Sequence, residues 1–548
     1  MIRNRLWLKQ AFLVAPLCCL LSAITEGQQK LAPPLTNATR WSSANPIEPE
    51  AGNWAPLLLS SADEIRVPPP PANLDAKTAE ELEVVRKALR SPSSQQRALS
   101  CKWNTANQGK VWRRLVDDLV LHSGLGTPSM LRAYTALHIA MADAVLAAWN
   151  NQNYYLRPRP SEMDGSIQPL VPEPQNPAYP SDSAAAAGAA ERILAYFFPR
   201  YEDRVSALAD EATSAQVLGG LNLPSDVNVG RELGQKVAER VIAAIEADGR
   251  PNQLVFGRDI PWEQPFADET VRLGVRFTRT KADYSNDITW EAPQQKVGVV
   301  YGDALPWNQF LPVDPTAGAW EPFFLTRAKV NELAAVPPPP ANSSPETKRD
   351  IDEIVTALNN RTCYTDFIVF KNGVDQPGHW AVQVLDMLAE RHGWSAPRTD
   401  RATAILFTSM YDALLGTWYD KYHFMRPRPA LLEPTLPTVI LTPKHPSYPA
   451  GHATFTAAGV AVLRAFFPED ESEYGGMVEE VNNARVWAGV HYRSDMTAGN
   501  QVGDRVAAAV LSAIHLDGTP GENPYHSVAK NLSDSSGGPY YNPFYHRK

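Results

Sequence analysis

An internal repeat constrains the fold of this chain more than any other feature of its sequence. The string that runs from Val67 through four prolines to Ala72-Asn73 returns at 336–342, a displacement of 269 positions. The same displacement aligns further short segments: Arg132-Ala133 with Arg401-Ala402, Asp143-Ala144 with Asp412-Ala413, Arg157-Pro158-Arg159-Pro160 with Arg426-Pro427-Arg428-Pro429, Tyr179-Pro180 with Tyr448-Pro449, Phe197-Phe198-Pro199 with Phe466-Phe467-Pro468, and Ser225-Asp226 with Ser494-Asp495. Chance does not preserve one displacement over so many anchors, so the chain is predicted to contain two related units.

Apolar residues recur at helical spacing in four segments of each unit. These segments are 127–149, 183–198, 203–218 and 226–246 in the first unit, and 396–418, 452–466, 472–488 and 494–514 in the second. Alternating patterns typical of strands are sparse. We therefore predict an all-α fold in which two tandem four-helix-bundle repeats pack against each other as a pseudo-dimer.

The repeat also sets the expected domain boundaries. The first bundle is predicted over 54–253 and the second over 320–522, joined by a linker at 254–319 and followed by a C-terminal tail at 523–548. The linker is rich in aromatic residues and proline and lacks clear periodicity. This pattern favours a packed connector over a lid that covers a site. Residues 28–53 are rich in Pro, Ser and Asn and are expected to be extended.

The N-terminus has the pattern of a secretory signal. A basic start is followed by an apolar run from Ala11 to Ala23, which is too short to span a bilayer comfortably. We interpret 1–27 as a cleaved signal peptide and expect a secreted or periplasmic protein with no membrane span in the mature chain. Cleavage would leave Cys101 and Cys363 as the mature thiols, and their sequence does not decide whether they pair.

The overall charge narrows the class of partner. The chain has a formal net charge of -9 at pH 7. A general nucleic-acid binder usually needs a basic surface to displace counterions from phosphates, so no nucleic acid is expected as a partner. Any anion that the protein binds must be captured by a local cluster of cations.

Such a cluster occurs once, between Lys421 and Asp495. When the two units are aligned at the repeat displacement, most of its charged or titratable residues align with uncharged residues of the first unit. Lys421 aligns with Gln152, His452 with Ser183, Arg485 with Gln216, and His491 with Asn222, while Arg428 still aligns with Arg159. The anchors of the fold repeat, but the reactive set does not. The second unit is therefore predicted to be active and the first to be structural.

The residue types in this cluster suit the capture of a multi-oxygen anion. The guanidinium groups of Arg428 and Arg485 present paired donors to oxygens, and Lys421 adds a compact charge. Gly451 lets the backbone of a predicted helix start approach the anion closely. Three buried cations would repel one another without a bound anion. The alternative is a set of solvated surface charges.

Two histidines and one aspartate complete the predicted site. His452 would move protons to or from the anion, whereas His491 would contact its central atom, either ligating a metal oxyanion or attacking phosphorus. Asp495 either orients a site group or caps the following helix. The remaining histidines are expected to be structural, with His423 and His445 intermediate because they neighbour the motifs: His122, His138, His379, His392, His515, His526 and His546.

Three motifs in this stretch resemble the superfamily that unites vanadium-dependent haloperoxidases, class A acid phosphatases and type 2 phosphatidic acid phosphatases. They are Lys421-x6-Arg428-Pro429, Pro449-Ala450-Gly451-His452 and Ala484-Arg485-x5-His491-x3-Asp495. Their longer contexts are more similar to the haloperoxidases than to the phosphatases. So is the predicted architecture, because chloroperoxidase-like enzymes have two four-helix bundles of which only the second is catalytic.

The resemblance implies specific roles for the residues of the cluster. One vanadate per chain would be held by Lys421, Arg428, Gly451 and Arg485, with His491 as the ligand of the metal. The catalytic residues would be His452, which assists peroxide binding, together with Lys421 and Asp495. Hydrogen peroxide and a halide would be the substrates, and a hypohalous-acid equivalent the product.

Two further residues concern the halide, and two depart from the family pattern. Trp418 matches a residue of the chloroperoxidase pocket and His445 matches one typical of bromoperoxidases, which favours bromide or iodide. Ala450 and Ala484 replace serines of the family pattern, and the loss of one hydroxyl donor typically weakens anion binding by roughly tenfold to hundredfold.

Two alternatives stay open at this point. The first is a secreted acid phosphatase in which His491 attacks phosphorus and His452 protonates the leaving alcohol. The second is a non-catalytic oxyanion-binding relative that lost turnover together with the serine at Ala450. A membrane lipid phosphatase is disfavoured, because the chain lacks the necessary series of apolar runs near 20 residues.

Overall fold

The computed structural model describes residues 40–43, 46–105, 107–121, 125–247, 314, 316–373, 378–433, 435–443 and 445–514. Every regular element assigned within these ranges is a helix, so the predicted all-α fold is confirmed. The expected signal peptide, the C-terminal tail and most of the predicted linker lie outside the described residues. Below, the first half means the described residues up to 247, and the second half means 316–514.

The eight predicted helices are all present, together with helices that the sequence analysis did not predict. The first half contains η2 (Ala51–Asn53), α1 (Ala76–Leu89), α2 (Ser94–Trp103), α3 (Gly109–Leu121), α4 (Thr127–Tyr155), α5 (Pro160–Met163), α6 (Asp182–Phe197), η3 (Pro199–Tyr201), α7 (Glu202–Leu218) and α8 (Pro224–Glu246). The second half contains η6 (Ala317–Ala319), α10 (Arg327–Ala334), α11 (Pro345–Asn359), α12 (Cys363–Lys371), α13 (His379–Arg391), α14 (Ala396–Phe424), α15 (Pro429–Leu432), α16 (Gly451–Phe466), η7 (Pro468–Glu473), α17 (Met477–Trp487) and α18 (Arg493–Ile514).

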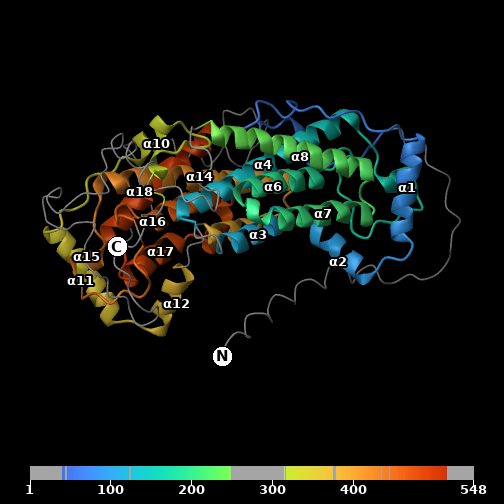
Figure 1. Ribbon diagram of the computed structural model, residues 1–548. Coiled ribbons are helices and arrows are strands. Elements are labelled where there is room, and N and C mark those ends of the chain that lie inside the picture. Colours follow the sequence, from blue (N-terminus) through green and yellow to red (C-terminus); the bar gives the residue numbers. More distant parts are fainter. Residues whose placement is uncertain are drawn as a thin grey trace.

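The long helices α4 and α14 form the junction between the halves and pack against each other. Figure 1 shows the blue-to-green first half beside the yellow-to-red second half. At the junction Phe407 of α14 stacks on Tyr134 and His138 of α4, with ring centroids 5.2 and 5.0 Å apart. Nearly every residue of both helices is buried because each helix is covered on several sides. The core therefore runs continuously through the two halves.

Both central helices end in the same way. Each has 29 residues and stops at a left-handed residue, Leu156 after α4 and Met425 after α14, with φ of 51° and 53°. An Arg-Pro-Arg-Pro segment follows in each case, and proline cannot continue a helix because it lacks an N–H group and its ring clashes with the preceding turn. Lys421 is thereby held in the last turn of α14, and Arg428 lies just beyond it.

Glycines allow α16 to lie directly against α18, and α6 against α8. A Cβ atom on Gly499 of α18 would lie 2.4 Å from the carbonyl oxygen of Ala450, closer than any real side chain permits. The equivalent Gly230 of α8 meets Ser181 O in the same way, at 2.3 Å. Because these positions lack a side chain, the start of α16 lies directly against α18, and the start of α6 against α8.

Several hydrogen bonds recur at positions 269 residues apart. Arg157 Nη1 donates to Asp226 Oδ1 at 2.5 Å in the first half, and Arg426 Nη1 donates to Asp495 Oδ1 at 2.7 Å in the second. The phenol groups of Tyr179 and Tyr448 each donate to the carbonyl of a proline in the string that first revealed the repeat. This recurrence supports the predicted repeat, while the exact domain boundaries stay a prediction.

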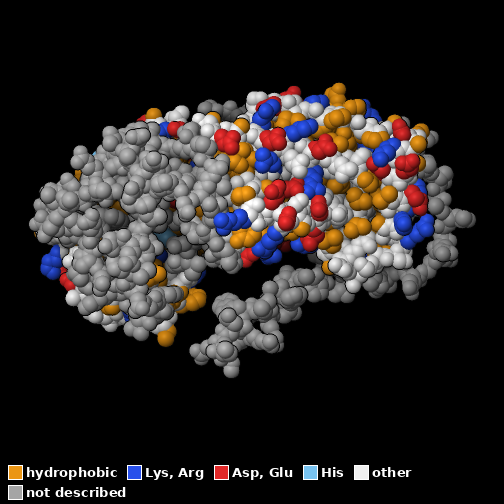
Figure 2. All heavy atoms as spheres, in the orientation of Figure 1, with side chains coloured by type: hydrophobic (Ala, Val, Ile, Leu, Met, Phe, Trp, Pro, Cys, Tyr) orange, Lys and Arg blue, Asp and Glu red, His pale blue; other side chains and the backbone are white. Residues whose placement is uncertain are grey.

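The described part of the surface carries both signs of charge. On the face shown in Figure 2, Lys and Arg side chains are interspersed with Asp and Glu side chains. Within the described ranges, no helix is both long enough and apolar enough to cross a membrane. Of the two described cysteines, Cys101 is half-buried, whereas Cys363 is an exposed free cysteine.

Candidate functional site

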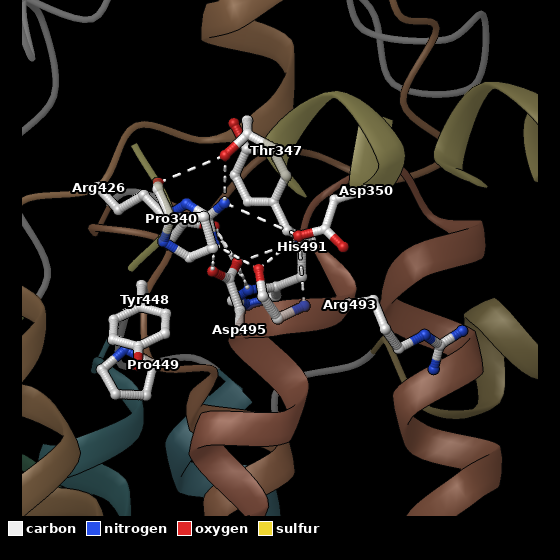
Figure 3. Close-up of polar contacts among 12 residues, drawn as sticks. Pro340, Thr347, Asp350, Arg426, Tyr448, Pro449, His491, Arg493 and Asp495 are labelled. Atoms are coloured by element: carbon white, nitrogen blue, oxygen red, sulfur yellow. Dashed lines mark hydrogen bonds and ion pairs between the residues drawn. The ribbon is translucent and has the colours of Figure 1, made fainter. Parts of the chain in front are cut away.

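The site is built around a buried ion pair between Arg426 and Asp495 (Figure 3). The same guanidinium reaches Thr347 Oγ1 at 3.2 Å and covers the ring of Tyr492, 3.9 Å from its centroid. Asp350 lies 3.8 Å away on α11. Because the first half has the same pair in Arg157 and Asp226, we regard Arg426 as part of the framework that holds the start of α18.

Asp495 distributes its two carboxylate oxygens over four donors. Oδ1 accepts from Arg426, and Oδ2 accepts from Ser447 Oγ at 2.5 Å, from His491 Nδ1 at 2.9 Å and from the backbone N–H of Tyr492 at 3.1 Å. The contact with Tyr492 caps α18, and the contact with His491 orients the imidazole. The two roles that the sequence left as alternatives are thus both present in the geometry.

The hydrogen bonds of His491 define which of its nitrogens carries the proton. Arg428 Nη1 lies 2.8 Å from His491 Nε2, and a guanidinium can only donate, so Nε2 must accept. Nδ1 then carries the hydrogen and donates it to Asp495. Burial, followed by the positive charges of Arg428, Lys421 and Arg485, lowers the pKa of His491 well below its ordinary value. The imidazole is therefore neutral at pH 7, with the lone pair of Nε2 directed at the cations.

Lys421 is fully buried and is held by backbone oxygens. Its Nζ donates to the carbonyls of Pro446 at 2.9 Å and Ser447 at 3.1 Å, and also to that of Pro449. Burial, together with the charges of Arg428 and Arg485, lowers its pKa well below the ordinary value. A bound anion would reverse this shift because it would stabilise the ammonium form.

Arg428 is also fully buried, and its partners are neutral. It donates to the backbone oxygens of His445 at 3.0 Å and Val490 at 2.7 Å, and to the imidazoles of His491 and His445. Burial is the main cause that lowers its pKa to about 9. Arg485, at the end of α17, is equally buried and contributes a further positive charge to the pKa of both Lys421 and Arg428.

Positive charge therefore exceeds negative charge among the described residues of the site. Neither Lys421 nor Arg428 is hydrogen-bonded to a carboxylate in this part of the chain. Asp495, the nearby carboxylate, is already paired with Arg426. Buried cations are costly unless they are paired, so this arrangement is suited to a bound anion.

The start of α16 adds backbone donors to the same region. Gly451 is the first residue of the helix, and the N–H groups of a first turn have no partner within the helix. A Cβ atom on Gly451 would lie 3.0 Å from Trp418 Cζ3, so a side chain there would require the indole ring to shift. The N-cap residue Ala450 has no side-chain hydrogen bond, whereas the equivalent Ser181 accepts from the N–H of Ala184 at 3.3 Å.

His452 lies in the first turn of α16 and lines a cavity of about 180 Å³. Burial and the charges of Arg485, Arg428 and Lys421 lower its pKa well below the ordinary value, which favours the neutral form. The other lining residues come from α12, α13, α16 and α17 and the residue that follows α12: Lys371, Asn372, His379, Trp380, Gln383, Phe455, Thr456 and Val481. His379 was expected to be structural, and it lies on this cavity.

Trp418 and His445 lie together beside the cations. Their ring centroids are 4.7 Å apart, and Lys421 Nζ lies 5.5 Å from the centroid of Trp418. Burial, followed by the charges of Arg428 and Lys421, lowers the pKa of His445 well below its ordinary value. The two predicted pocket residues thus border the anion site on the side of Arg428.

Sequence reasoning missed Ser447 and Arg426, which complete the support of His491. Ser447 is fully buried and lies 3.5 Å from His491 Nδ1 in addition to its contact with Asp495. Its place in the string His-Pro-Ser-Tyr-Pro was visible, but no spacing rule connects it with a carboxylate 48 positions away. Arg426 was visible as an anchor shared by both units, which indicated a structural role and not a role beside the histidine.

The first half shows a less charged version of the same arrangement. Gln152 Nε2 donates to the carbonyl of Pro180 at 2.8 Å, as Lys421 does to Pro449. Asn222 takes the place of His491 and donates to Ala178 O at 2.7 Å. Arg159 is retained at the position of Arg428 and donates to the backbone oxygens of Asn176 and Leu221 at 3.0 Å. The backbone is thus held in the same way without the charge of Lys421, so that charge is not needed to build the fold.

Comparison with known proteins finds a family model that matches part of the second half. Residues 401–517 match the family described as the PAP2 superfamily. The matched stretch is thus similar to that superfamily. It runs from within α14 through α18 and includes every predicted site residue. A search of curated proteins finds no significant match to the chain.

About three quarters of the chain is similar in fold to solved vanadium-dependent enzymes. A bacterial vanadium-dependent iodoperoxidase matches with a TM-score of 0.53 at 18% identity, over 75% of this chain and 96% of that one. A bacterial vanadium-dependent chloroperoxidase in its holo form matches with a TM-score of 0.51 at 14% identity, over 72% and 94%. Its apo form gives the same TM-score. At such identities the likeness shows that the fold is shared.

Proposed function

We propose that the protein is a vanadate-dependent haloperoxidase that uses hydrogen peroxide to oxidise a halide, with bromide or iodide favoured, to a hypohalous-acid equivalent. One observation carries this proposal. The lone pair of a neutral His491 faces the buried cations Lys421 and Arg428, and neither cation is hydrogen-bonded to a carboxylate of the described residues. The fold shared with an iodoperoxidase and a chloroperoxidase supports it.

The residues present fit one vanadate per chain. An oxyanion of vanadium needs hydrogen-bond donors around its oxygens and one nitrogen ligand for the metal. Lys421, Arg428, Arg485 and the N–H of Gly451 supply the donors, and His491 Nε2 supplies the ligand. Asp495 holds the ring through Nδ1, the usual arrangement for a metal-bound imidazole. Asp495 thus acts as a positioning residue.

When bound, vanadate supplies a Lewis acid that activates peroxide for attack by a halide. The chain supplies the rest. Lys421 and Arg428 stabilise negative charge on the oxygens, and their own burial makes this interaction stronger than it would be in water. His452 is neutral and borders the cavity, so its ring can accept a proton from incoming peroxide and return it to the leaving oxygen. Trp418 and His445 would border the halide.

The test is a titration of the purified protein with orthovanadate, followed by assays with peroxide and bromide or iodide and, in parallel, with an aryl phosphate. We expect halogenation that saturates with vanadate. Hydrolysis of the aryl phosphate that vanadate inhibits, without halogenation, would replace the proposal by an acid phosphatase. Saturable vanadate binding without either activity would identify a non-catalytic relative.

A matched pair of variants locates the activity. His491→Asn places in the second half the residue that the first half already has at this position, so the fold should be retained while the metal ligand is lost. We expect no halogenation from this variant. Asn222→Ala, at the equivalent position of the first half, should leave halogenation unchanged. Full halogenation by His491→Asn would refute the assignment of the ligand.

We also propose that the protein is exported and that residues 1–27 are removed. The basic start and the short apolar run support this proposal. Expression with these residues in a bacterial host, followed by fractionation and N-terminal sequencing, provides the test. Recovery in the cytoplasm with an intact N-terminus would contradict it.

A further inference from the structure

A second cavity lies where the two halves meet and is here called the junction cavity. It measures about 250 Å³ and is lined by residues of both halves. The first half contributes residues around Gln108, Trp149 and the start of α6 at Asp182, and the second half contributes Trp394 and Asp400, which lie just before and within α14. It is separate from the cavity that borders His452, with which it shares no lining residue.

The junction cavity is the counterpart of the anion site, but its lining is acidic. Trp149, Asn176 and Ser183 line it where Trp418, His445 and His452 lie in the second half. Asp182 takes the place of Gly451, and its Oδ2 accepts from Trp149 Nε1 at 2.9 Å. Among the described residues, the lining includes three carboxylates, those of Glu173, Asp182 and Asp400, and no Lys, Arg or His. Arg159, the counterpart of Arg428, lies behind the lining residue Asn176 and donates to its Oδ1 at 2.8 Å. The carboxylates of the lining therefore favour a cation over an anion.

One acceptor on a residue that lines this cavity has no donor among the described residues. Gln108 Nε2 donates to the carbonyl of Trp103 at 3.0 Å and to Ser183 Oγ at 2.6 Å. A carbonyl can only accept, so the amide nitrogen must face Trp103 and the orientation of the amide is unambiguous. Gln108 Oε1 is then buried without a hydrogen-bond partner among the described residues. A ligand that donates a hydrogen bond would satisfy it.

Asp400 provides a second acceptor, and it carries charge. It is only 3% exposed, and no described residue donates a hydrogen bond to it. The cation that lowers the pKa of Asp400 is Arg113, and Arg113 is already paired with Asp386. A buried carboxylate in this position is costly unless a cation reaches it.

We propose that the junction cavity binds a small organic ammonium ion, a primary amine in its protonated form. The ammonium group donates to Asp400 and Gln108 Oε1, and the hydrocarbon part packs between Trp149 and Trp394. Primary ammonium fits because it offers several donors and one positive charge to a site with several acceptors. Aromatic rings attract such cations through their faces. This inference does not depend on vanadate binding in the second half.

The pH dependence of binding follows from Asp400. Burial is the main cause that raises its pKa to about 7, Asp182 and Asp386 raise it further, and Arg113 lowers it. The ammonium ion binds the ionised carboxylate, so affinity should fall as pH falls through about 7. Glu173 and Asp182 also line the cavity, and Asp400 is the group in it whose ionisation sets the sign of the effect.

The experiment is a calorimetric titration of the full-length protein at a pH near 8 with benzylamine, butylamine and methylamine, and with benzyl alcohol as the uncharged control. We expect saturable binding of at least one amine at millimolar concentration or below, and binding of benzyl alcohol that is weaker than that of benzylamine by roughly tenfold or more. Absence of saturable binding by all three amines, or equal binding of benzylamine and benzyl alcohol, would overturn the proposal.

Two variants locate the site. Asp400→Asn keeps the shape and removes the charge, so amine affinity should fall by about tenfold or more. Thermal unfolding of this variant without ligand should show unchanged or higher stability, which separates the loss of binding from a loss of folding. His491→Asn, in the other site, should bind the amine as the unaltered protein does. An unchanged affinity in Asp400→Asn would refute the proposed anchor.

Discussion

The substitution Ala450→Ser tests how the anion site works. Ala450 is the N-cap residue of α16, and its counterpart Ser181 caps α6 through the N–H of Ala184 at 3.3 Å. The surroundings match, since both residues are fully buried and both backbone N–H groups donate at 3.0 Å to the carbonyl of an aspartate, Asp495 or Asp226. A serine at position 450 should therefore cap α16 without strain.

Two effects of different size are expected from Ala450→Ser. The cap should raise the free energy of unfolding by about 1 kcal/mol. The hydroxyl hydrogen stays available to donate to the bound anion, which is worth about 1–3 kcal/mol and corresponds to roughly tenfold to hundredfold tighter vanadate binding. Denaturant unfolding measures the first effect, and a vanadate titration by calorimetry measures the second.

The first half offers the matched control. Ser181→Ala should lower the free energy of unfolding by about 1 kcal/mol and leave the affinity for vanadate unchanged. If Ala450→Ser stabilises the protein but does not tighten vanadate binding, the side chain at position 450 does not face the anion. That result would refute the placement of the anion at the start of α16.

Three further predictions follow from particular contacts. Lys421→Gln should retain the fold, because Gln152 holds Pro180 in the same way, but it should weaken vanadate binding by about tenfold or more in a calorimetric titration; equal affinity would exclude Lys421 from the site. The pKa of His491 is lowered in the folded state, so the unfolded state binds more protons below about pH 6.5 and the free energy of unfolding falls on acidification. His491→Asn should remove up to about 1.4 kcal/mol per pH unit of this dependence. Parallel plots of the free energy of unfolding against pH for the two proteins would contradict this expectation. Asp412→Asn should lower the free energy of unfolding by about 2–4 kcal/mol, since Asp412 accepts from the N–H groups of residues 323–325 at 3.0–3.3 Å; a change below about 1 kcal/mol in denaturant unfolding would show that this contact does not anchor the segment.

The helices that carry the site were predictable because local signals define them. α14 was expected from 396 and begins there, and α16 and α18 begin within one residue of the expected starts. Their apolar periodicity reflects burial on several sides. The start of α17 was less predictable: it lies at Met477 instead of 472, because the 3-10 segment Pro468–Glu473 precedes it. The outer helices α11, α12 and α13 were not predicted.

The partners of the site residues were less predictable than the residues themselves. Ser447 and Arg426 contact Asp495 across 48 and 69 positions, and no periodicity links such residues. The role of Asp400 was not predictable for a similar reason. It lies within a helix that was predicted, but its role depends on a cavity shared with the first half.

The sequence by itself determined which residues this protein has available for chemistry and in which unit they occur. The repeat made this possible, because it separates anchors that recur from residues that occur once. Only the tertiary structure decided what those residues do. Whether His491 presents a lone pair depends on Arg428 and Asp495 meeting its two nitrogens, and whether a pocket is positive or negative depends on which charges are buried together. Both are set by the packing of α4, α6, α14, α16 and α18, whose contacts connect residues far apart in the chain.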